Sequence, residues 1–187
     1  MNLIKTKLKD AYILEPKVYG DHRGFFMETY NTKLLEEQGF YFNFVQDNHA
    51  LSKESGVLRG LHYQLDPFAQ TKLVRVTKGA VYDVIVDIRE GSPTFGQWEG
   101  FFLSEDNKRQ LLVPQGFAHG YCTLVENTEF LYKVDNYYSP EHDRGIAWND
   151  PYLNIDWPTS NPILSEKDTK HPNLNDLESQ FIYKGKE

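Results

Sequence analysis

Short runs of strand-forming residues, separated by turn residues, fill the middle of the chain and constrain its fold most strongly. These runs are rich in Val, Ile, Tyr and Phe and end at Gly, Pro, Asn or Ser, which is typical of β-strands. They span residues 72–79, 80–91, 97–104, 109–116, 118–125 and 128–138. Strands at this spacing predict a sandwich or barrel and not a sheet of alternating strands and helices.

The flanking segments carry weaker signals. Residues 32–38 are the best early helix candidate, and Gly39 is the expected end of that helix. The tail contains Pro140, Pro151, Pro158, Pro162 and Pro172. Because proline interrupts regular strands, we expect loops and short helices wrapped over the barrel and no second domain, with 165–167 and 176–178 as the helix candidates.

Charge and cysteine content narrow the class of protein. The net charge of −7 provides no overall basic footprint for nucleic acid, although a few clustered Arg and Lys suffice for a phosphorylated ligand. The single Cys122 cannot form an internal disulfide, which suits a reducing compartment. Neither a secretory signal nor an apolar run long enough for a membrane span is evident. We expect a cytoplasmic protein with no membrane partner.

The segment VLRGLHYQL, residues 57–65, contains a histidine on a predicted strand. Strand alternation places His62 and Gln64 on one side and Arg59 on the other, unless a bulge at Gly60 brings Arg59 round. A histidine on the inner wall of a barrel is a candidate base, because its pKa lies near working pH. A core histidine bound to the backbone is an equally good interpretation.

The segment LLVPQGFAHGY resembles the second sequence motif of the cupin superfamily, with Pro114, Gly116 and His119 in the pattern P-x-G-x-x-H. Metal-binding cupins add an earlier pair of histidines in the pattern H-x-H. At that position this chain has His62 but carries Gln64 in place of the second histidine. One histidine from each segment is too few for a metal site, which normally has three or more protein ligands. We therefore expect no metal.

Charged residues on these strands are further candidates. Asp83 and Asp87 share a face of the run 80–91, and a carboxylate inside a barrel needs a partner such as His62, an arginine or a lysine. Lys72 lies on the same face of its strand as Val74 and Val76, because strand side chains alternate, so it faces inward if the two valines do. There it could stabilise an enolate oxygen, whereas at a strand end it could simply extend to water.

Tyr132 shares a face with Phe130 and Val134 on the run 128–138. A buried tyrosine hydroxyl needs a hydrogen-bond partner and can also donate a proton. Tyr137 or Tyr138 could stack on a flat ring at the rim. Structural tyrosines are far commoner than catalytic ones, so this feature carries weight only together with the others.

Seven segments, taken in order from about residue 2 to residue 183, resemble the dTDP-4-dehydrorhamnose 3,5-epimerase family. They are GDHRGFFMETY, FVQDNHALS, GVLRGLHYQ, KLVRVTKGAVYDVIVDIREGSPTFGQW, VPQGFAHGY, EFLYKVDNYYSPEHDRGIAWNDP and PILSEKD. The resemblance implies a mostly β, cupin-type double-stranded jelly-roll barrel in one domain of residues 1–187. It implies a core at about 40–138, with segments 1–39 and 139–187 packed on the barrel or on the partner in a homodimer that exchanges N-terminal segments.

The resemblance also implies a reaction. The nucleotide sugar dTDP-4-dehydro-6-deoxy-D-glucose is inverted at C3 and C5 to dTDP-4-dehydro-β-L-rhamnose, in dTDP-L-rhamnose biosynthesis. Both carbons flank the C4 ketone, so loss of either proton gives a resonance-stabilised enolate. A base, an enolate stabiliser and an acid suffice, so the expectation includes no cofactor.

The resemblance assigns roles residue by residue. His62 would be the base, Asp168 would orient it, Lys72 would stabilise the oxyanion, Tyr132 would return a proton, and Asp83 would assist. Tyr138 would also stack on the base of the nucleotide. The residues expected to hold the nucleotide and the sugar are Arg23, Glu28, Gln46, Asp47, Asn48, Arg59, Lys72, His119, Tyr138, Asp143 and Lys167.

Three other functions remain open at this level. A single-site 3-epimerase or a ketoisomerase acting on a related 4-keto-6-deoxy sugar would share the histidine and aspartate. A metal-dependent cupin enzyme would need further ligands. A sugar-binding jelly roll without catalysis would not need both a base and an acid.

Overall fold

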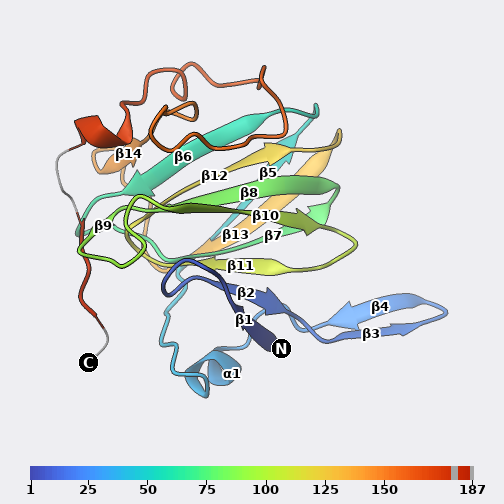
Figure 1. The fold of residues 1–187 in the computed structure, drawn as a ribbon. Coiled ribbons are helices and arrows are strands. Elements are labelled where there is room, and N and C mark those ends of the chain that lie inside the picture. The colour runs from blue at the N-terminus through green and yellow to red at the C-terminus, as the bar shows by residue number, and fades with distance from the viewer. Residues whose placement is uncertain (178–180, 186–187) are drawn as a thin grey trace.

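The computed structural model describes residues 1–177 and 181–185, and two antiparallel sheets packed face to face dominate them (Figure 1). In spatial order, the six-stranded sheet contains β1 (Asn2–Lys5), β2 (Tyr12–Glu15), β11 (Gln110–Val113), β7 (Lys72–Lys78), β13 (Thr128–Val134) and β5 (Gln46–Ser52). The five-stranded sheet contains β10 (Trp98–Ser104), β8 (Ala80–Asp87), β12 (Phe117–Thr123), β6 (Leu58–Gln64) and β14 (Asp143–Gly145). The mostly β, cupin-like prediction is confirmed.

The core between the sheets follows from strand alternation. Inward-facing Val74, Val76, Ile85, Leu111 and Phe130 are buried in one cluster that both sheets contribute to. Each is 4% exposed or less, so the two inner faces exclude water along their length. This apolar contact holds the two sheets at a fixed spacing.

The outer faces of the sheets are covered by the terminal segments. The tail places Ile146, Leu153 and Trp157 over the five-stranded sheet. On the six-stranded sheet, Leu35 of α1 (Thr32–Glu36) and a neighbouring set of aromatic rings cover the strands. That set comprises Tyr12, Tyr30, Phe40, Phe42 and Phe44.

The helix predictions had mixed outcomes. The helix predicted at 32–38 is present as α1 but ends earlier, at Glu36, and the Asn31 side chain caps its start by accepting from Leu34 N–H. The expected helix at 165–167 is wrong: Ser165 Oγ accepts from Asp168 N–H at 3.2 Å, and this local bond favours a turn. The expected helix at 176–178 is instead a 3₁₀ turn, η1 (Leu174–Asp176), and residue 178 lies outside the described residues.

A bulge in β6 determines which of its side chains face inward. His62 pairs with His119 and Arg59 with Tyr121, so two residues of β6 lie opposite the single Gly120. Gly60 has a φ of +142°, and a Cβ there would come within 2.5 Å of Gly120 Cα. Only glycine fits this conformation and spacing. The predicted bulge is confirmed, and it places Arg59 and His62 on the same face.

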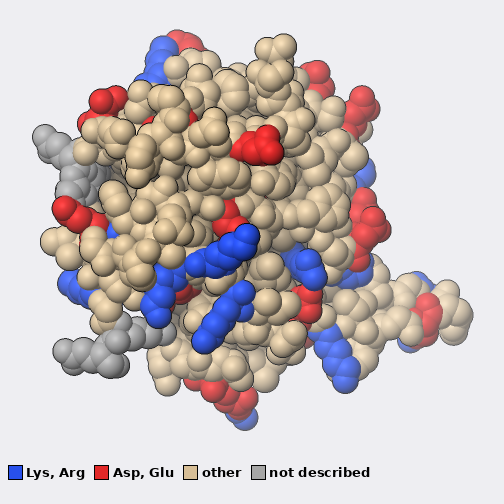
Figure 2. Space-filling view, in the orientation of Figure 1, with Lys and Arg blue, Asp and Glu red and all other residues tan. Residues whose placement is uncertain are grey.

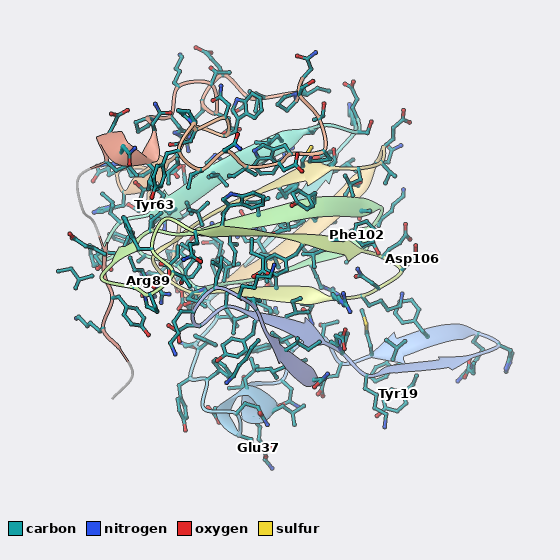
Figure 3. All side chains as sticks on the ribbon, in the orientation of Figure 1. Tyr19, Glu37, Tyr63, Arg89, Phe102 and Asp106 are labelled. Atoms are coloured by element: carbon teal, nitrogen blue, oxygen red, sulfur yellow. The ribbon has the colours of Figure 1, made fainter. Side chains whose placement is uncertain are left out.

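A hairpin extends from the body of the molecule. It consists of β3 (Val18–Asp21) and β4 (Gly24–Met27), and Tyr19 marks it in Figure 3. Phe25 is 58% exposed and Phe26 70% exposed. Neighbouring exposed aromatic rings of this kind mark a surface available for contact.

On the face of the molecule shown in Figure 2, acidic and basic side chains are interspersed, and neither positive nor negative charge covers a broad area. That distribution gives this face no extended basic surface for nucleic acid. Among the described residues, no helix combines the length and apolar character that crossing a bilayer requires.

A buried arginine joins both ends of the chain to the sheet. Arg89 of β9 (Arg89–Glu90) donates from Nη2 to Asp87 Oδ2 at 2.8 Å and from Nη1 to Asp10 Oδ2 at 3.0 Å. The guanidinium of Arg89, which Figure 3 labels, lies 4.6 Å from the ring centroid of Phe117 and 4.8 Å from that of Tyr183. β9 also pairs in parallel with β15 (Phe181–Ile182).

We expect Arg89→Met to lower the free energy of unfolding by about 3–5 kcal/mol, because Asp87 would stay buried without its charged partner. Burial raises the pKa of Asp87, but hydrogen bonds from Arg89, Ser92 and Thr94 outweigh it and hold the pKa below its usual value. The stabilisation is therefore present above the carboxyl's unfolded pKa and is lost as pH falls through the folded one. Urea unfolding at neutral and acidic pH measures both effects.

The matched control is Arg109→Met. Arg109 pairs with Glu15 at 2.8 Å, but its side chain is 44% exposed, so its loss should cost about 0–1 kcal/mol. Equal effects of the two substitutions would contradict a structural role for the buried pair.

Candidate functional site

A pocket of about 440 Å³ opens between the two sheets, beneath the tail. Strands of both sheets and residues 163–168 contribute to its wall. Seven of the residues predicted from sequence line it, namely Arg59, His62, Lys72, His119, Tyr132, Lys167 and Asp168. Side chains that are up to 109 residues apart in the sequence therefore meet in one cavity.

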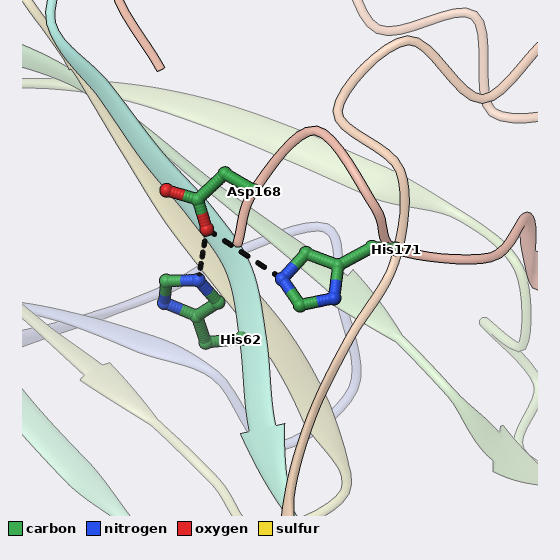
Figure 4. A group of neighbouring side chains, drawn as sticks. All are labelled: His62, Asp168 and His171. Carbon is green, nitrogen blue, oxygen red and sulfur yellow. Dashed lines mark hydrogen bonds and ion pairs between the residues drawn. The ribbon is translucent and has the colours of Figure 1, made fainter. Parts of the chain in front are cut away.

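His62 and Asp168 form a short polar contact in this pocket. His62 Nε2 lies 2.5 Å from Asp168 Oδ1 (Figure 4), and the carboxylate side chain is only 4% exposed. Because the carboxylate accepts from Nε2–H, the neutral ring presents Nδ1 as its acceptor. Burial lowers the pKa of His62, against the opposing effect of Asp168. The neutral ring is therefore the resting form at neutral pH.

Asp168 is held by its own segment. Ser165 Oγ donates to Asp168 Oδ2 at 2.8 Å, and His171 Nε2 lies 3.5 Å from Oδ1. Although burial opposes it, these contacts and His62 bring the pKa of Asp168 well below its usual value. Neither Ser165 nor His171 was predicted from the sequence. The spacing S-x-x-D, which permits a side-chain to backbone bond, could have identified Ser165.

Lys72 faces the pocket, as the parity of its strand predicts. Its Nζ lies 3.4 Å from the His62 carbonyl oxygen. Burial lowers the pKa of Lys72 to about 8, and the charges of Asp143 and Asp83 limit the effect. An ammonium group in such a site interacts strongly with a developing negative charge.

Asp83 pairs with His119 and not with His62, which corrects one of the partners proposed from sequence. His119 Nε2 lies 3.0 Å from both carboxylate oxygens of Asp83, which is fully buried. The two side chains meet because Tyr121, two residues after His119, pairs with Asp83 across β12 and β8. Burial raises the pKa of Asp83, against the effects of His119 and Lys72.

Tyr132 and Phe130, both on β13 of the six-stranded sheet, and Tyr121, on β12 of the other sheet, give the pocket an aromatic wall. The rings of Tyr121 and Phe130 stack at 4.0 Å, and Tyr132 lies 6.2 Å from Phe130. Burial raises the pKa of Tyr132, so its hydroxyl stays protonated at neutral pH. Arg59 Nε lies 3.4 Å from Ser52 Oγ beside this wall. Tyr121 and Phe130 were not expected in the site, because their spacing is equally typical of core residues.

Four more predicted residues are connected at the rim. Asp143 accepts from Tyr138 OH at 3.0 Å and pairs with Lys167. Gln46 Oε1 accepts from Tyr138 N–H at 3.3 Å, and Gln46 Nε2 donates to Asn48 Oδ1 at 2.9 Å. Tyr138 keeps 56% of its surface exposed beside this network, so its ring face is available to a ligand.

Three predicted residues lie away from the pocket of their own chain. Asp47 is adjacent to Asn48 on β5, so alternation turns it outward, where it pairs with Lys133 at 2.8 Å. Arg23 pairs with Asp21 on the extended hairpin, and Glu28 accepts from Asn31 at 3.0 Å. A single chain therefore does not bring Arg23, Glu28 or Asp47 to the site.

Three side chains in the described part of the chain lie close enough together to be considered as metal ligands. His62, Asp168 and His171 place one ligand atom each within 4.8 Å of one another. However, two ligands of one tetrahedral ion, each about 2.1 Å from it, lie about 3.4 Å apart. The 2.5 Å between His62 Nε2 and Asp168 Oδ1 matches a charge-assisted hydrogen bond and is too short for shared coordination.

Known proteins resemble this chain over most of its length. Residues 5–176 match the family model described as dTDP-4-dehydrorhamnose 3,5-epimerase. A protein of that name from Shigella flexneri is 59% identical over 169 residues, which cover 90% of this chain and 93% of the relative. This chain belongs to the dTDP-4-dehydrorhamnose 3,5-epimerase family.

Solved structures of two epimerases with this fold contain relevant ligands. The Bacillus anthracis dTDP-4-dehydrorhamnose 3,5-epimerase, with TDP and PPi bound, has a TM-score of 0.90 and 58% identity, covering 92% of this chain and 98% of that one. The Legionella pneumophila dTDP-6-deoxy-D-glucose-3,5-epimerase is in complex with dTDP-4-keto-L-rhamnose. It has a TM-score of 0.94 and 48% identity, covering 98% of this chain and 99% of that one.

Proposed function

We propose that this chain epimerises dTDP-4-dehydro-6-deoxy-D-glucose at C3 and C5, giving dTDP-4-dehydro-β-L-rhamnose for dTDP-L-rhamnose biosynthesis. One observation carries the proposal. His62, on β6, and Tyr132, on β13, belong to opposite sheets and line the same pocket. Inversion at carbon needs a base on one side of the sugar and an acid on the other, which this arrangement provides.

The proposed chemistry conserves protons. His62 Nδ1 takes the proton from C3 or C5, and the C–H electrons move into the enolate, placing negative charge on the C4 oxygen. Lys72 stabilises that oxygen, and Asp168 stabilises the imidazolium. Tyr132 then donates a proton to the opposite face of the same carbon, and proton exchange with solvent restores both side chains.

The substrate-holding roles follow from charge and position. Arg59 and Lys167, both lining the pocket, suit the diphosphate, since Arg and Lys are the usual phosphate partners. His119, anchored by Asp83, would bind the sugar. Tyr138, held by Gln46 and Asp143, would stack on the base. Asn48, which is bonded to Gln46, would support the nucleotide at the same rim.

The reaction as proposed needs no cofactor. Carbon is not oxidised or reduced overall, and Lys72 supplies the positive charge that a metal would otherwise contribute at the C4 oxygen. We also propose a cytoplasmic location, because Cys122 is a buried free thiol and a lone thiol suits a reducing compartment.

In deuterated buffer, the substrate should gain deuterium at both C3 and C5. We expect His62→Asn to slow exchange at both carbons by about 10²- to 10⁴-fold, because the general base is lost. Tyr132→Phe should retain proton removal but slow inversion, above all at C5. NMR and mass spectrometry of the recovered sugar measure exchange and inversion separately.

The control for these variants is His49→Gln. His49 is exposed on the outer face and pairs with Glu129, so its loss should leave exchange unchanged. Deuterium at C3 alone would favour a single-site 3-epimerase or a ketoisomerase, and binding with no exchange at all would favour a sugar-binding protein.

The rate should depend on pH through two groups of the free protein. kcat/KM should fall in acid, below the lowered pKa of His62, because the imidazolium cannot accept a proton. It should fall again above the Lys72 pKa of about 8, when the ammonium becomes neutral. Lys72→Arg should remove the basic limb, since guanidinium stays charged. A basic limb unchanged in that variant would contradict the role of Lys72.

We propose that the protein is a homodimer in which the N-terminal segment of each copy completes the partner's site. The exposed rings of Phe25 and Phe26, with Arg23 and Glu28 nearby, support this proposal. Sedimentation should give a dimer, and Arg23→Ala should raise KM without dissociating it. A fully active monomer would contradict the proposal.

A further inference from the structure

His171 is a largely buried imidazole beside Asp168, with 9% of its side chain exposed, that the proposed reaction does not use. Its Nε2 lies 3.5 Å from Asp168 Oδ1, the same oxygen that His62 Nε2 approaches at 2.5 Å (Figure 4). The two imidazole rings meet edge to face, with centroids 5.5 Å apart and an interplanar angle of 74°. The carboxylate therefore has an imidazole nitrogen on each of two sides.

The space for His171 comes from a glycine on the strand next to His62. Gly145 of β14 pairs directly with His62 of β6. A Cβ at Gly145 would lie 2.5 Å from ring atoms of His171, so any larger residue would displace the ring. The absence of a side chain at this point lets His171 lie against the strand pair that bears the proposed base.

The backbone beyond His171 is fixed. Ala147 N–H donates to Pro172 carbonyl oxygen at 2.8 Å, and Leu174 N–H donates to Asp150 Oδ2 at 2.6 Å. Asp150 and Leu174 are both buried. The segment thus has a defined path over the sheet, and the imidazole that it carries has little freedom to move away.

The nitrogen of His171 that faces Asp168 lacks a hydrogen bond within the described part of the chain. Nε2 is buried from solvent and makes no closer polar contact than the 3.5 Å to Asp168 Oδ1. A buried polar atom without a partner costs free energy, and contacts at catalytic sites commonly shorten when substrate binds. Asp168 is the group positioned to accept a hydrogen bond from His171 Nε2.

We propose that His171 is a positioning residue for the reaction, which donates to Asp168 Oδ1 and thereby limits how strongly the carboxylate holds a proton on His62. This inference rests on the proposed function. Asp168 must orient His62 without making it so strong a base that it stays protonated. A second donor on the same oxygen reduces the negative charge available to His62 and so keeps the base in its neutral, proton-accepting form.

The predicted direction of the change in the His62 pKa distinguishes a positioning role of His171 from a role in packing alone. Besides Asp168 and His171, the groups facing His62 are Lys72, Lys167 and the adjacent His119, and these are retained in every variant below. Removal of the His171 donor should raise the pKa of His62, because Asp168 then stabilises the imidazolium more fully. Loosening the tail should move Asp168 away from His62 and lower that pKa.

The experiment compares His171→Leu, which keeps volume but has no donor, with His171→Gln, which keeps a side-chain N–H. The His62 ring protons are titrated by NMR in the free protein and assigned with His62→Asn, while kcat/KM is measured against pH. Leu174→Ala controls for lost tail packing. His142→Gln is the matched histidine control, because Ser139 and Phe68 hold that ring instead.

We expect His171→Leu to raise the pKa of His62 and to move the acid limb of kcat/KM to higher pH. In mildly acidic buffer kcat/KM should fall by about three- to tenfold, as for loss of one ordinary hydrogen bond, and by less in alkaline buffer. His171→Gln should restore both readouts. His142→Gln should leave the His62 titration unchanged, and Leu174→Ala should lower the His62 pKa or leave it unchanged.

An unchanged or lowered His62 pKa in His171→Leu, or the same rise in Leu174→Ala, would overturn the inference. The titration needs no substrate, so it decides the role of His171 separately from the deuterium experiment. A wild-type protein without exchange at C3 and C5 would refute the proposed function and leave the titration result standing.

Discussion

The contact between His62 and Asp168 depends on almost every part of the fold. The two residues are 106 positions apart, and one lies on a central strand while the other lies in the tail. The tail reaches the sheet because its apolar residues, including Ile146, Leu153 and Trp157, pack on the outer face of that sheet. Burial of this apolar surface supplies the free energy that holds a carboxylate in a nearly water-free position.

Two glycines on neighbouring strands determine which face of the sheet carries the proposed base. The bulge at Gly60 turns Arg59 and His62 to the same inner face, and Gly120 leaves room for it. Tyr132 faces inward from the opposite sheet, where ordinary alternation suffices. The distance between base and acid is therefore determined by how closely two sheets pack, which the apolar core fixes and which local sequence does not encode.

Two aspartates on one face of β8 have different roles: one supports the candidate site and the other stabilises the fold. Asp83 lies behind His119, which lines the pocket, and anchors it. Asp87, four residues on, binds Arg89 and joins the ends of the chain to the sheet. Both are fully buried and both are paired, as buried charges must be. Their partners differ because Asp83 lies within the strand, beside β12 and its His119, whereas Asp87 ends the strand, next to Arg89 of β9.

Local pattern alone predicted β6–β8 and β10–β13, α1, the faces that Lys72 and Tyr132 share with their apolar neighbours, and Gly60 as the place for a bulge, because each depends on periodicity or on the conformational range of single residues. It did not predict β1–β5 or β14. Family resemblance brought Asp168 into the predicted site. Neither indicated that Asp83 would bind His119, that Asp47 would turn outward, or that His171 would lie on Asp168. Those pairings arise only when the sheets pack and the tail crosses them, since contacts between distant segments depend on the shape of the whole chain.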